Sequence, residues 1–371
     1  MEKSFLRYDP IVFVIGDGYD IRFVTREKGK AGVRIGNEVF WDASNGVIRS
    51  ETNVHSVRIP QKNLDRAGSY TVLYCSYPHR EAYFPKHTPE EEVTYRFFPV
   101  RKGEEIRAFW ISDTHGHSRL PVEAGKFFGD SLDLLILGGD INESENEEQI
   151  LLTYQISEEL TGGSRPVLFV RGNHDLRGRL AELLPEYVPT DDGKVFYTFR
   201  LGSLWGVILD AGEDKEDGSE EYGGTAAFIP FRKEEVKFLQ KVACRAKEEY
   251  EAEGVETRLA LCHLPFTDYT DPSPVFDQSW SRKEYNEMTG LLNGMGVQAM
   301  LSGHMHKSYI HTGKEQVAVD VPPAFPLLVS GFPGGEECYI GMALDIGKRS
   351  IRVRFVNHNR EVLEDHTVEL K

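Results

Sequence analysis

The sequence predicts an all-β sandwich followed by an α/β domain in which sheets lie between helices. Three observations predict this arrangement. Residues 11–98 carry short β-branched and aromatic runs separated by turn residues. Beyond residue 103, strand-like apolar runs alternate with segments of helical periodicity. The chain has 371 residues, which is long for one domain and sufficient for two.

The N-terminal part contains no sustained helical periodicity. The runs that favour strands are 11–15, 19–24, 32–35, 56–59, 70–75 and 93–98. About seven short strands in about one hundred residues are typical of an immunoglobulin-like or fibronectin type III-like sandwich. The composition changes over residues 99–103. We therefore predict one domain over 1–102 and a second over 103–371.

The second part alternates strands and helices, which is typical of an α/β fold. Strands are expected at 107–111, 132–137, 167–170, 204–209, 258–262 and 299–301, and strands return over 310–370. A helix is expected at 147–160, and an amphipathic helix is expected at 231–253. The acidic segment 211–224 is expected to form a loop, and the sequence leaves its role open.

Composition and charge restrict the class of partner. The formal net charge is −16, with 59 acidic against 43 basic residues, which disfavours nucleic acids and anionic membranes. The sequence has no apolar run of about eighteen residues and no apolar N-terminal segment, so we expect neither a membrane span nor a signal peptide. The four cysteines are widely spaced and are expected to be free thiols in a cytoplasmic protein. The oligomeric state is left open.

Five polar clusters each follow an expected strand. They are Asp113-Thr-His115, Gly139-Asp140, Gly172-Asn-His-Asp175, His263 and Gly303-His-Met-His306. The loops that leave the carboxyl ends of strands in α/β folds converge on one region, so these side chains can meet in space. Carboxylate and imidazole ligands without thiolate suit Mn, Fe or Zn. Two such ions about 3.5–4 Å apart can bind one phosphoryl group between them.

Each cluster alone also has a structural interpretation. Asp113 could cap a helix, Asn173 could be an ordinary turn residue, and Gly139 and Gly172 could serve tight turns. All five clusters occur together, in order, each behind its own strand. That combination favours a metal site over five unrelated structural roles.

The series D-x-H, G-D, G-N-H-D, H and G-H-x-H resembles the signature of the calcineurin-like metallophosphoesterase superfamily. The resemblance implies a four-layer metallophosphoesterase sandwich that binds two divalent or trivalent metal ions. It implies that Asp113, His115 and His306 bind one ion. It further implies that Asn173, His263 and His304 bind the other, with Asp140 bridging the two.

The resemblance also implies a mechanism for hydrolysing phosphate esters. A metal-bound hydroxide would attack phosphorus in line, without a phosphoenzyme. His174 would protonate the leaving oxygen or stabilise the transition state. Asp175 would orient His174 through a hydrogen bond.

The order of the two domains resembles purple acid phosphatases, which carry a fibronectin-like domain ahead of the catalytic one. Those enzymes take a tyrosine ligand three residues after the bridging aspartate, and that ligand gives them their colour. The corresponding residue here is Glu143. We therefore expect a metal site of the wider superfamily and no purple colour.

The substrate is expected to be a small phosphorylated molecule, with the choice between monoester and diester left open. Arg171 and His117 are candidate substrate-binding residues, although either could have a surface role. Two other functions compete. A nuclease is disfavoured because no Lys/Arg-rich segment flanks the motifs. A non-catalytic binding or scaffold protein with a vestigial metal site is disfavoured because no ligand has been lost.

Overall fold

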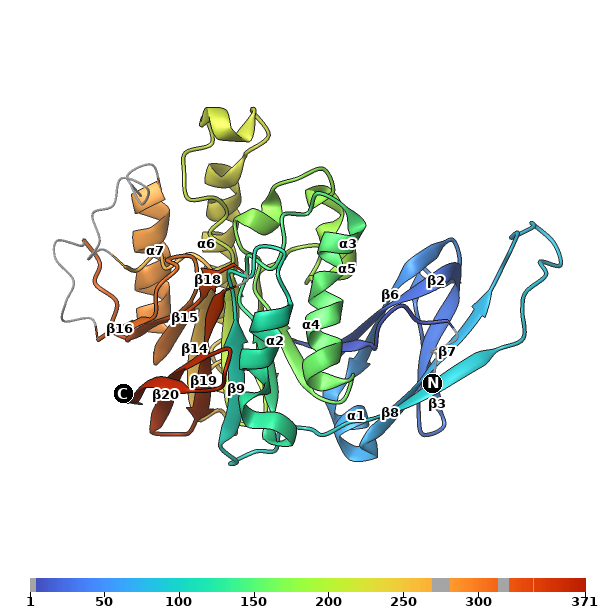
Figure 1. Ribbon diagram of the computed structural model, residues 1–371, viewed down its shortest axis with the longest axis horizontal. Helices are drawn as coiled ribbons and strands as arrows, with labels where there is room; N and C mark the ends of the chain where they lie inside the picture. The colour runs from blue at the N-terminus through green and yellow to red at the C-terminus, as the bar shows by residue number, and fades with distance from the viewer. Residues whose placement is uncertain (1–4, 269–280, 313–319, 336) are drawn as a thin grey trace.

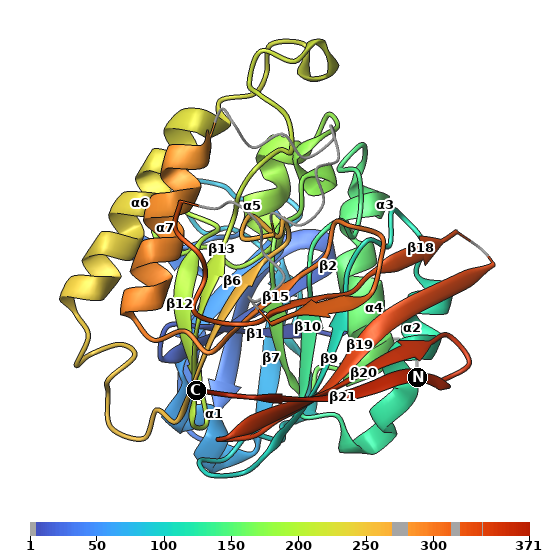
Figure 2. The ribbon, with the colours of Figure 1, turned by 90° about the vertical axis from the view of Figure 1, so that its left-hand side faces the viewer.

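Two β-sheets lie face to face at the centre of the molecule, and helices cover their outer faces (Figure 1). The computed structural model describes residues 5–268, 281–312, 320–335 and 337–371. The layers run helix, sheet, sheet, helix, so the predicted four-layer α/β fold is confirmed. Helices α6 and α7 flank one side, and α2 and α4 flank the other (Figure 2).

The larger sheet has 13 strands, and its main path runs β21-β20-β19-β9-β10-β11-β1-β2-β7-β8. Strand β18 pairs with β19, and β3 and β6 pair with β2. The N-terminal strands are β1 (Ile11–Ile15), β2 (Gly18–Ile35), β3 (Glu38–Trp41), β6 (Thr52–Pro60), β7 (Ser69–Ser76) and β8 (Glu91–Arg96). The later strands are β9 (Ile106–Ile111), β10 (Leu134–Leu137), β11 (Pro166–Phe169), β18 (Phe332–Gly334), β19 (Cys338–Ile346), β20 (Ser350–Asn357) and β21 (Val362–Glu369).

The smaller sheet has six strands in the order β12-β13-β14-β15-β17-β16. They are β12 (Tyr197–Leu201), β13 (Leu204–Leu209), β14 (Thr257–Cys262), β15 (Ala299–Ser302), β16 (Tyr309–His311) and β17 (Leu327–Val329). A separate two-stranded hairpin joins β4 (Ala43–Ser44) and β5 (Val47–Ile48). The longer helices are α1 (Gln61–Ala67), α2 (Arg119–Gly125), α4 (Leu152–Thr161), α6 (Phe228–Cys244) and α7 (Arg282–Gly294).

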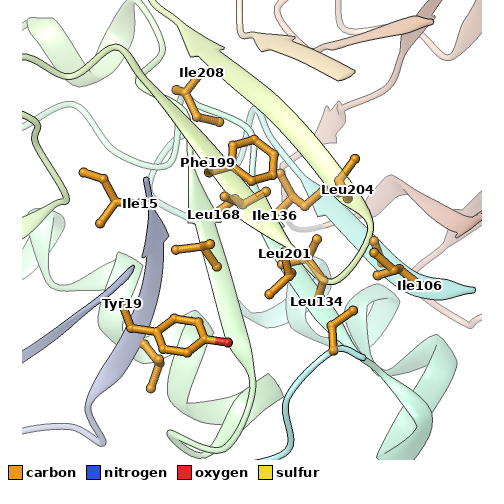
Figure 3. Packing of buried hydrophobic residues seen from close by; sticks show 14 of the residues in the cluster. Ile15, Tyr19, Ile106, Leu134, Ile136, Leu168, Phe199, Leu201, Leu204 and Ile208 are labelled. Carbon is orange, nitrogen blue, oxygen red and sulfur yellow. The ribbon is translucent and has the colours of Figure 1, made fainter. Parts of the chain in front are cut away.

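Alternation of side chains along the central strands fills three separate cores. Residues of one parity face the opposite sheet, as Trp110 on β9 and Ile208 on β13 do. Residues of the other parity face the helices, as Phe109 does beneath α2 and α4 and Val207 does beneath α6 and α7. Figure 3 shows the layer between the two sheets. Strands buried on both faces explain the nearly unbroken apolar runs in the sequence.

The N-terminal region is rich in strands, consistent with the predicted β sandwich. Its first strand also joins the later strands of the larger sheet, because β1 pairs in parallel with β11, with Val12 opposite Pro166. Ile15 and Tyr19 pack in the same core as Phe199 and Leu201 (Figure 3). The two regions therefore share hydrogen bonds and a hydrophobic core, and the division at 102/103 stays a prediction.

Several expected elements differ from the structure in extent. The expected strands 19–24 and 32–35 belong to one long strand, β2, which continues through a register shift between Val24 and Gly29. The helix expected over 231–253 ends at Cys244. Most residues of 245–253 are exposed or half-buried, and helical propensity without an apolar face to bury is a weak stabilising force.

Two expectations about the environment of the chain can be compared with the structure. The four cysteines are free, and they do not form disulfides with one another. Within the described ranges, no helix has the length and apolar character needed to cross a membrane.

Candidate metal centre

The five motifs meet at one edge of the two central sheets. Strands β9, β10 and β11 of the larger sheet and β14 and β15 of the smaller sheet end immediately before them. Parallel strands present their carboxyl ends at the same edge, so the following loops converge there. The seven side chains that lie in this region are Asp113, His115, Asp140, Asn173, His263, His304 and His306.

One group of possible ligands consists of Asp113, His115 and His306. Their ligand atoms all lie within 4.8 Å of one another. Nε2 of His306 is 3.5 Å from Oδ1 of Asp113 and 3.1 Å from Nε2 of His115. Two imidazole nitrogens that face each other at this distance can both direct lone pairs at one cation. The geometry therefore suits a metal ion held by one carboxylate and two histidines.

A second group consists of Asp140, His263 and His304, whose ligand atoms are also mutually within 4.8 Å. Nε2 of His263 lies 3.1 Å from Oδ2 of Asp140 and 3.9 Å from Oδ1 of Asp113. Nδ1 of His304 lies 3.0 Å from the amide oxygen of Asn173. His263 thus faces the carboxylates of both groups, and the two groups are neighbours.

The ring of His263 is held in an orientation suited to metal ligation. Its Nδ1 lies 2.8 Å from the carbonyl oxygen of Gly138 and donates a hydrogen bond to it. Its Nε2 is buried and has no hydrogen-bond partner among the described residues, although it faces Asp140. A buried nitrogen without a partner is costly unless another group binds it, and a cation between imidazole and carboxylate would satisfy both.

Backbone strain is concentrated at the same residues. In the described ranges, ten residues other than glycine have positive φ, and five of them are candidate ligands. These five are Asp113, His115, Asp140, His304 and His306. Such conformations cost free energy and persist where the surrounding structure enforces them, most often at functional sites.

Two motif glycines are required by close packing at the site. A Cβ atom at Gly172 would lie 2.2 Å from Oδ1 of Asp140, and one at Gly139 would lie 2.6 Å from Nδ1 of His263. Gly139 also has φ of +95°, which L side chains rarely adopt. The glycines of G-D and G-N-H-D therefore allow the candidate ligands to approach one another, beyond any role in turning the chain.

The site concentrates buried negative charge. Burial raises the pKa of Asp113 to about 7. Burial would lower the pKa of His263, but the carboxylates of Asp140 and Asp113 outweigh it and raise that pKa to about 10. Burial lowers the pKa of His115 to about 4 and of His304 to about 3, so both rings are neutral at pH 7. Buried carboxylates beside the neutral imidazoles of His115 and His304 are a favourable environment for a divalent cation.

His174 lies beside the first group of ligands. Its ring centroid is 4.5 Å from that of His115. Its Nδ1 is 2.9 Å from Oε1 of Glu143, and its Nε2 is 3.4 Å from Nη1 of Arg177. His174, His115 and Glu143 also bring their ligand atoms within 4.8 Å of one another. The sequence reasoning left both Glu143 and Arg177 without a role at the site.

The resemblance implies a hydrogen bond between Asp175 and the ring of His174, but the structure gives the Asp175 carboxylate other partners. The Asp175 carboxylate instead accepts backbone N–H groups from Gly172 and Asp140 at 2.8 and 3.0 Å. It also accepts those of Ile141 and Asn142, each at 3.2 Å. Because these donors surround both oxygens, Asp175 joins the G-D and G-N-H-D loops. The carboxylate that contacts the ring of His174 is that of Glu143.

The two candidate substrate-binding residues have different surroundings. Nε of Arg171 donates to Oδ2 of Asp210 at 2.5 Å, its guanidinium lies over the ring of Phe231, and its side chain is 11% exposed. These contacts give Arg171 a structural role in fixing the loop that follows β13. His117 is exposed, and a contact with substrate stays a prediction.

The sequence carried only a weak signal for Arg177. It lies two residues beyond the G-N-H-D motif, in a short turn that follows η2 (His174–Leu176). Its partner Glu213 comes from the acidic segment 211–224, which has no motif of its own. The position of Arg177 close to the G-N-H-D motif was the signal in the sequence that could have identified it as a site residue. Its ion pair with Glu213 could be recognised only from the folded structure.

Comparison with known proteins agrees with this geometry. The sequence model of the calcineurin-like phosphoesterase family matches residues 106–308, which include every candidate ligand. No curated protein matches the sequence.

The solved structures that share the fold include two whose likeness covers nearly the whole chain. One is a purple acid phosphatase from yellow lupin (Lupinus luteus) seeds, with a TM-score of 0.59 and 11% identity over 98% of this chain and 75% of that one. The other is PhoD, with a TM-score of 0.54 and 9% identity over 100% of this chain and 90% of that one. Both likenesses span the N-terminal strands as well as the catalytic region. The chain belongs to the calcineurin-like phosphoesterase family and is a metal-dependent phosphoesterase.

Proposed function

We propose that the protein hydrolyses esters of a small phosphorylated molecule with two metal ions bound side by side. The observation that carries this proposal is the adjacency of the two ligand groups across Asp113, Asp140 and His263. Asp113, His115 and His306 would hold one ion. Asn173, His263 and His304 would hold the other, and Asp140 would be shared.

The donor set fits such ions. It consists of carboxylate oxygens, an amide oxygen and imidazole nitrogens, which suit Mn, Fe or Zn. The thiol of Cys262, the residue next to His263, is not counted in this donor set. It is buried in the apolar core beneath α6 and α7. When bound, two ions would supply the positive charge that binds phosphoryl oxygens and activates the attacking water.

His174 would act on the leaving oxygen. Its backbone N–H donates to Oδ1 of Asp140 at 2.8 Å, which fixes the residue relative to the shared ligand. Its Nδ1 donates to Glu143, so Nε2 is the ring atom available for proton transfer. We propose that Glu143 orients this ring, and that Asp175 contributes by fixing the backbone of the two loops.

The proposal is tested by hydrolysis after the metals have been removed and restored. Metal-stripped protein is reconstituted separately with Mn, Fe or Zn and assayed with p-nitrophenyl phosphate and bis-p-nitrophenyl phosphate. Metal-dependent turnover of either ester is the expected result. Tight binding of two ions without turnover on any phosphate ester would instead favour the non-catalytic binding protein, and turnover limited to polynucleotides would favour a nuclease.

A further inference from the structure

We propose that Arg177 binds an outer oxygen of the substrate phosphoryl group and makes the site selective for phosphomonoesters over phosphodiesters. This inference rests on the proposed hydrolysis of phosphate esters. It assigns a substrate class to the site and a role to the acidic segment 211–224, neither of which follows from membership of the family.

The guanidinium of Arg177 is fixed by a bidentate ion pair. Its Nε and Nη2 each donate to an oxygen of Glu213 at 2.8 Å. The side chain of Glu213 is only 2% exposed, and its Oε2 also accepts the hydroxyl of Tyr222 at 3.2 Å. Paired, parallel hydrogen bonds restrict both the position and the plane of the guanidinium. One edge of the guanidinium, formed by Nε and Nη2, is therefore occupied by Glu213.

Nη1 takes no part in this pair and lies beside His174. Nη1 of Arg177 lies 3.4 Å from Nε2 of His174, the ring atom opposite the one that Glu143 holds. Nη1 of Arg177 also lies 3.5 Å from Oε1 of Glu221. Glu221 is exposed and forms an ion pair with Lys215. The Arg177 side chain is 25% exposed, so an anion can reach it from solvent. An anion bound beside Nε2 of His174 would therefore lie within reach of Nη1.

The surroundings make a fixed cation valuable at this position. Four carboxylates lie near His174 and Arg177, and a phosphate would be repelled by each of them. They are Glu143, Glu213, Asp214 and Glu221. Arg171, which directly precedes the G-N-H-D motif, donates to Asp210.

The chemistry of the two ester classes differs at one oxygen. A phosphomonoester has three non-bridging oxygens. If metal ions held by the candidate ligands bound two of them, a third charged oxygen would remain for Nη1. In a phosphodiester that position is an ester oxygen bearing a second substituent, which is a poor acceptor and carries no charge. A charge-assisted hydrogen bond would therefore be made with the monoester alone, worth about ten- to one-hundredfold in kcat/KM.

The acidic segment acts as the support for Arg177. Buried Arg232 donates to the carbonyl oxygens of Ala211 and Glu213, each at 2.6 Å. These bonds fix the backbone that carries Glu213, and Glu213 fixes the guanidinium. Glu213 is therefore a positioning residue that acts through Arg177.

The test compares Arg177→Gln and Arg177→Lys with the unaltered protein, all loaded with the same metal. For Arg177→Gln we expect kcat/KM for p-nitrophenyl phosphate to fall by about ten- to one-hundredfold, mainly through KM, with little change for bis-p-nitrophenyl phosphate. Arg177→Lys should recover part of the loss. Affinity for inorganic phosphate, measured by titration calorimetry, should fall in parallel. Equal losses on the two esters, or unchanged phosphate affinity, would overturn the proposal.

Two further variants separate binding from folding. Arg177→Gln leaves Glu213 as an unpaired buried carboxylate, so the double variant Arg177→Gln with Glu213→Gln removes both charges and should show the same loss of monoester selectivity. Arg107→Gln is the matched control, because Arg107 forms a similar bidentate pair with Asp133 away from the site. Arg107→Gln should leave the ratio of the two activities unchanged.

Glu221 provides a test of opposite sign. Because its carboxylate competes for Nη1, Glu221→Gln should tighten phosphate binding and lower KM for the monoester, by more than Glu220→Gln does. Glu220 is an exposed acidic neighbour, so that variant measures the general effect of removing one charge. No difference between the two variants would contradict a phosphate site at Nη1. If the unaltered protein lacked turnover with every metal, the proposed function would fail, whereas phosphate affinity would still test Arg177.

Discussion

Oε1 of Glu143 lies 2.9 Å from Nδ1 of His174, and the contact fixes which nitrogen of the ring is free to act. An ionised carboxylate can only accept, so Nδ1 carries the proton that is shared with Glu143. The same oxygen is 3.7 Å from Nδ1 of His115, a candidate metal ligand. One carboxylate oxygen therefore lies near both the candidate acid and a candidate metal ligand.

Removal of the His174 ring should separate catalysis from metal binding. His174→Ala is expected to lower kcat by about one-hundredfold to ten-thousandfold, because the leaving oxygen would lack a proton donor. Metal content, measured by inductively coupled plasma mass spectrometry, should equal that of the unaltered protein. Full activity on esters with poor leaving groups would show that His174 has another role.

Loss of Glu143 should have a smaller effect of the same kind. Glu143→Ala is expected to lower kcat by about tenfold to one-hundredfold through misorientation of His174. Glu143→Gln retains an oxygen acceptor and should retain more activity. If the double variant Glu143→Ala with His174→Ala were slower than His174→Ala by the full single-variant factor, Glu143 would act independently of His174.

Asp140 should be required for metal binding itself. Asp140→Asn removes a buried charge that faces His263 and is expected to lose bound metal together with activity. Metal content after dialysis measures the effect. Asp365→Asn, at an exposed carboxylate paired with Arg352, is the control and should keep both metal and activity. Retention of two ions by Asp140→Asn would argue against a shared ligand.

Close packing at the motif glycines predicts a local defect from a single methyl group. Gly172→Ala would place Cβ 2.2 Å from Oδ1 of Asp140, so we expect a loss of about 1–3 kcal/mol of stability and weaker metal binding. Gly218→Ala is the control, since no atom lies within 4 Å of its Cβ position. Thermal denaturation with and without metal would show whether the two substitutions differ as expected.

The stability of metal-stripped protein should depend on pH. The pKa of Asp113 is raised by burial to about 7 from a usual value of 3.8, so the folded state holds a proton that the unfolded state releases. Stability from this group is therefore lost as pH rises from about 4 to about 7. The raised pKa of His263, about 10 against 6.5, extends the loss above pH 6.5.

Metal should reverse this dependence, because it displaces protons from the same atoms. The difference in Tm between metal-loaded and metal-stripped protein is expected to grow between pH 5 and pH 8. Calorimetric scans at several pH values measure that difference. A constant difference across this range would mean that metal binds without displacing protons from the site.

The sequence was most informative where one physical rule governed many residues. The alternation of strand-like and helical segments was sufficient to predict an α/β fold, and the order of the motifs was sufficient to place the candidate ligands behind their strands. The role of the N-terminal strands was less accessible, because the pairing of Val12 with Pro166 joins segments far apart in the chain. No local pattern encodes such a partner.

The same limit applies within the site. The resemblance implies that Asp175 orients His174, yet the Asp175 oxygens accept backbone N–H groups from two loops. Arg171 is a candidate substrate-binding residue from its place next to a motif, and in the structure its Nε donates to Asp210. Side-chain direction depends on such neighbours, and they become known only once the loops are folded.

The measurement that tests the central claim most directly is a titration of metal-stripped protein with Mn²⁺, following metal content and p-nitrophenyl phosphate hydrolysis together. Two adjacent ions predict that turnover stays low through the first equivalent and rises as the second binds. Full turnover at one equivalent, or two bound ions without hydrolysis of any phosphate ester, would contradict the account.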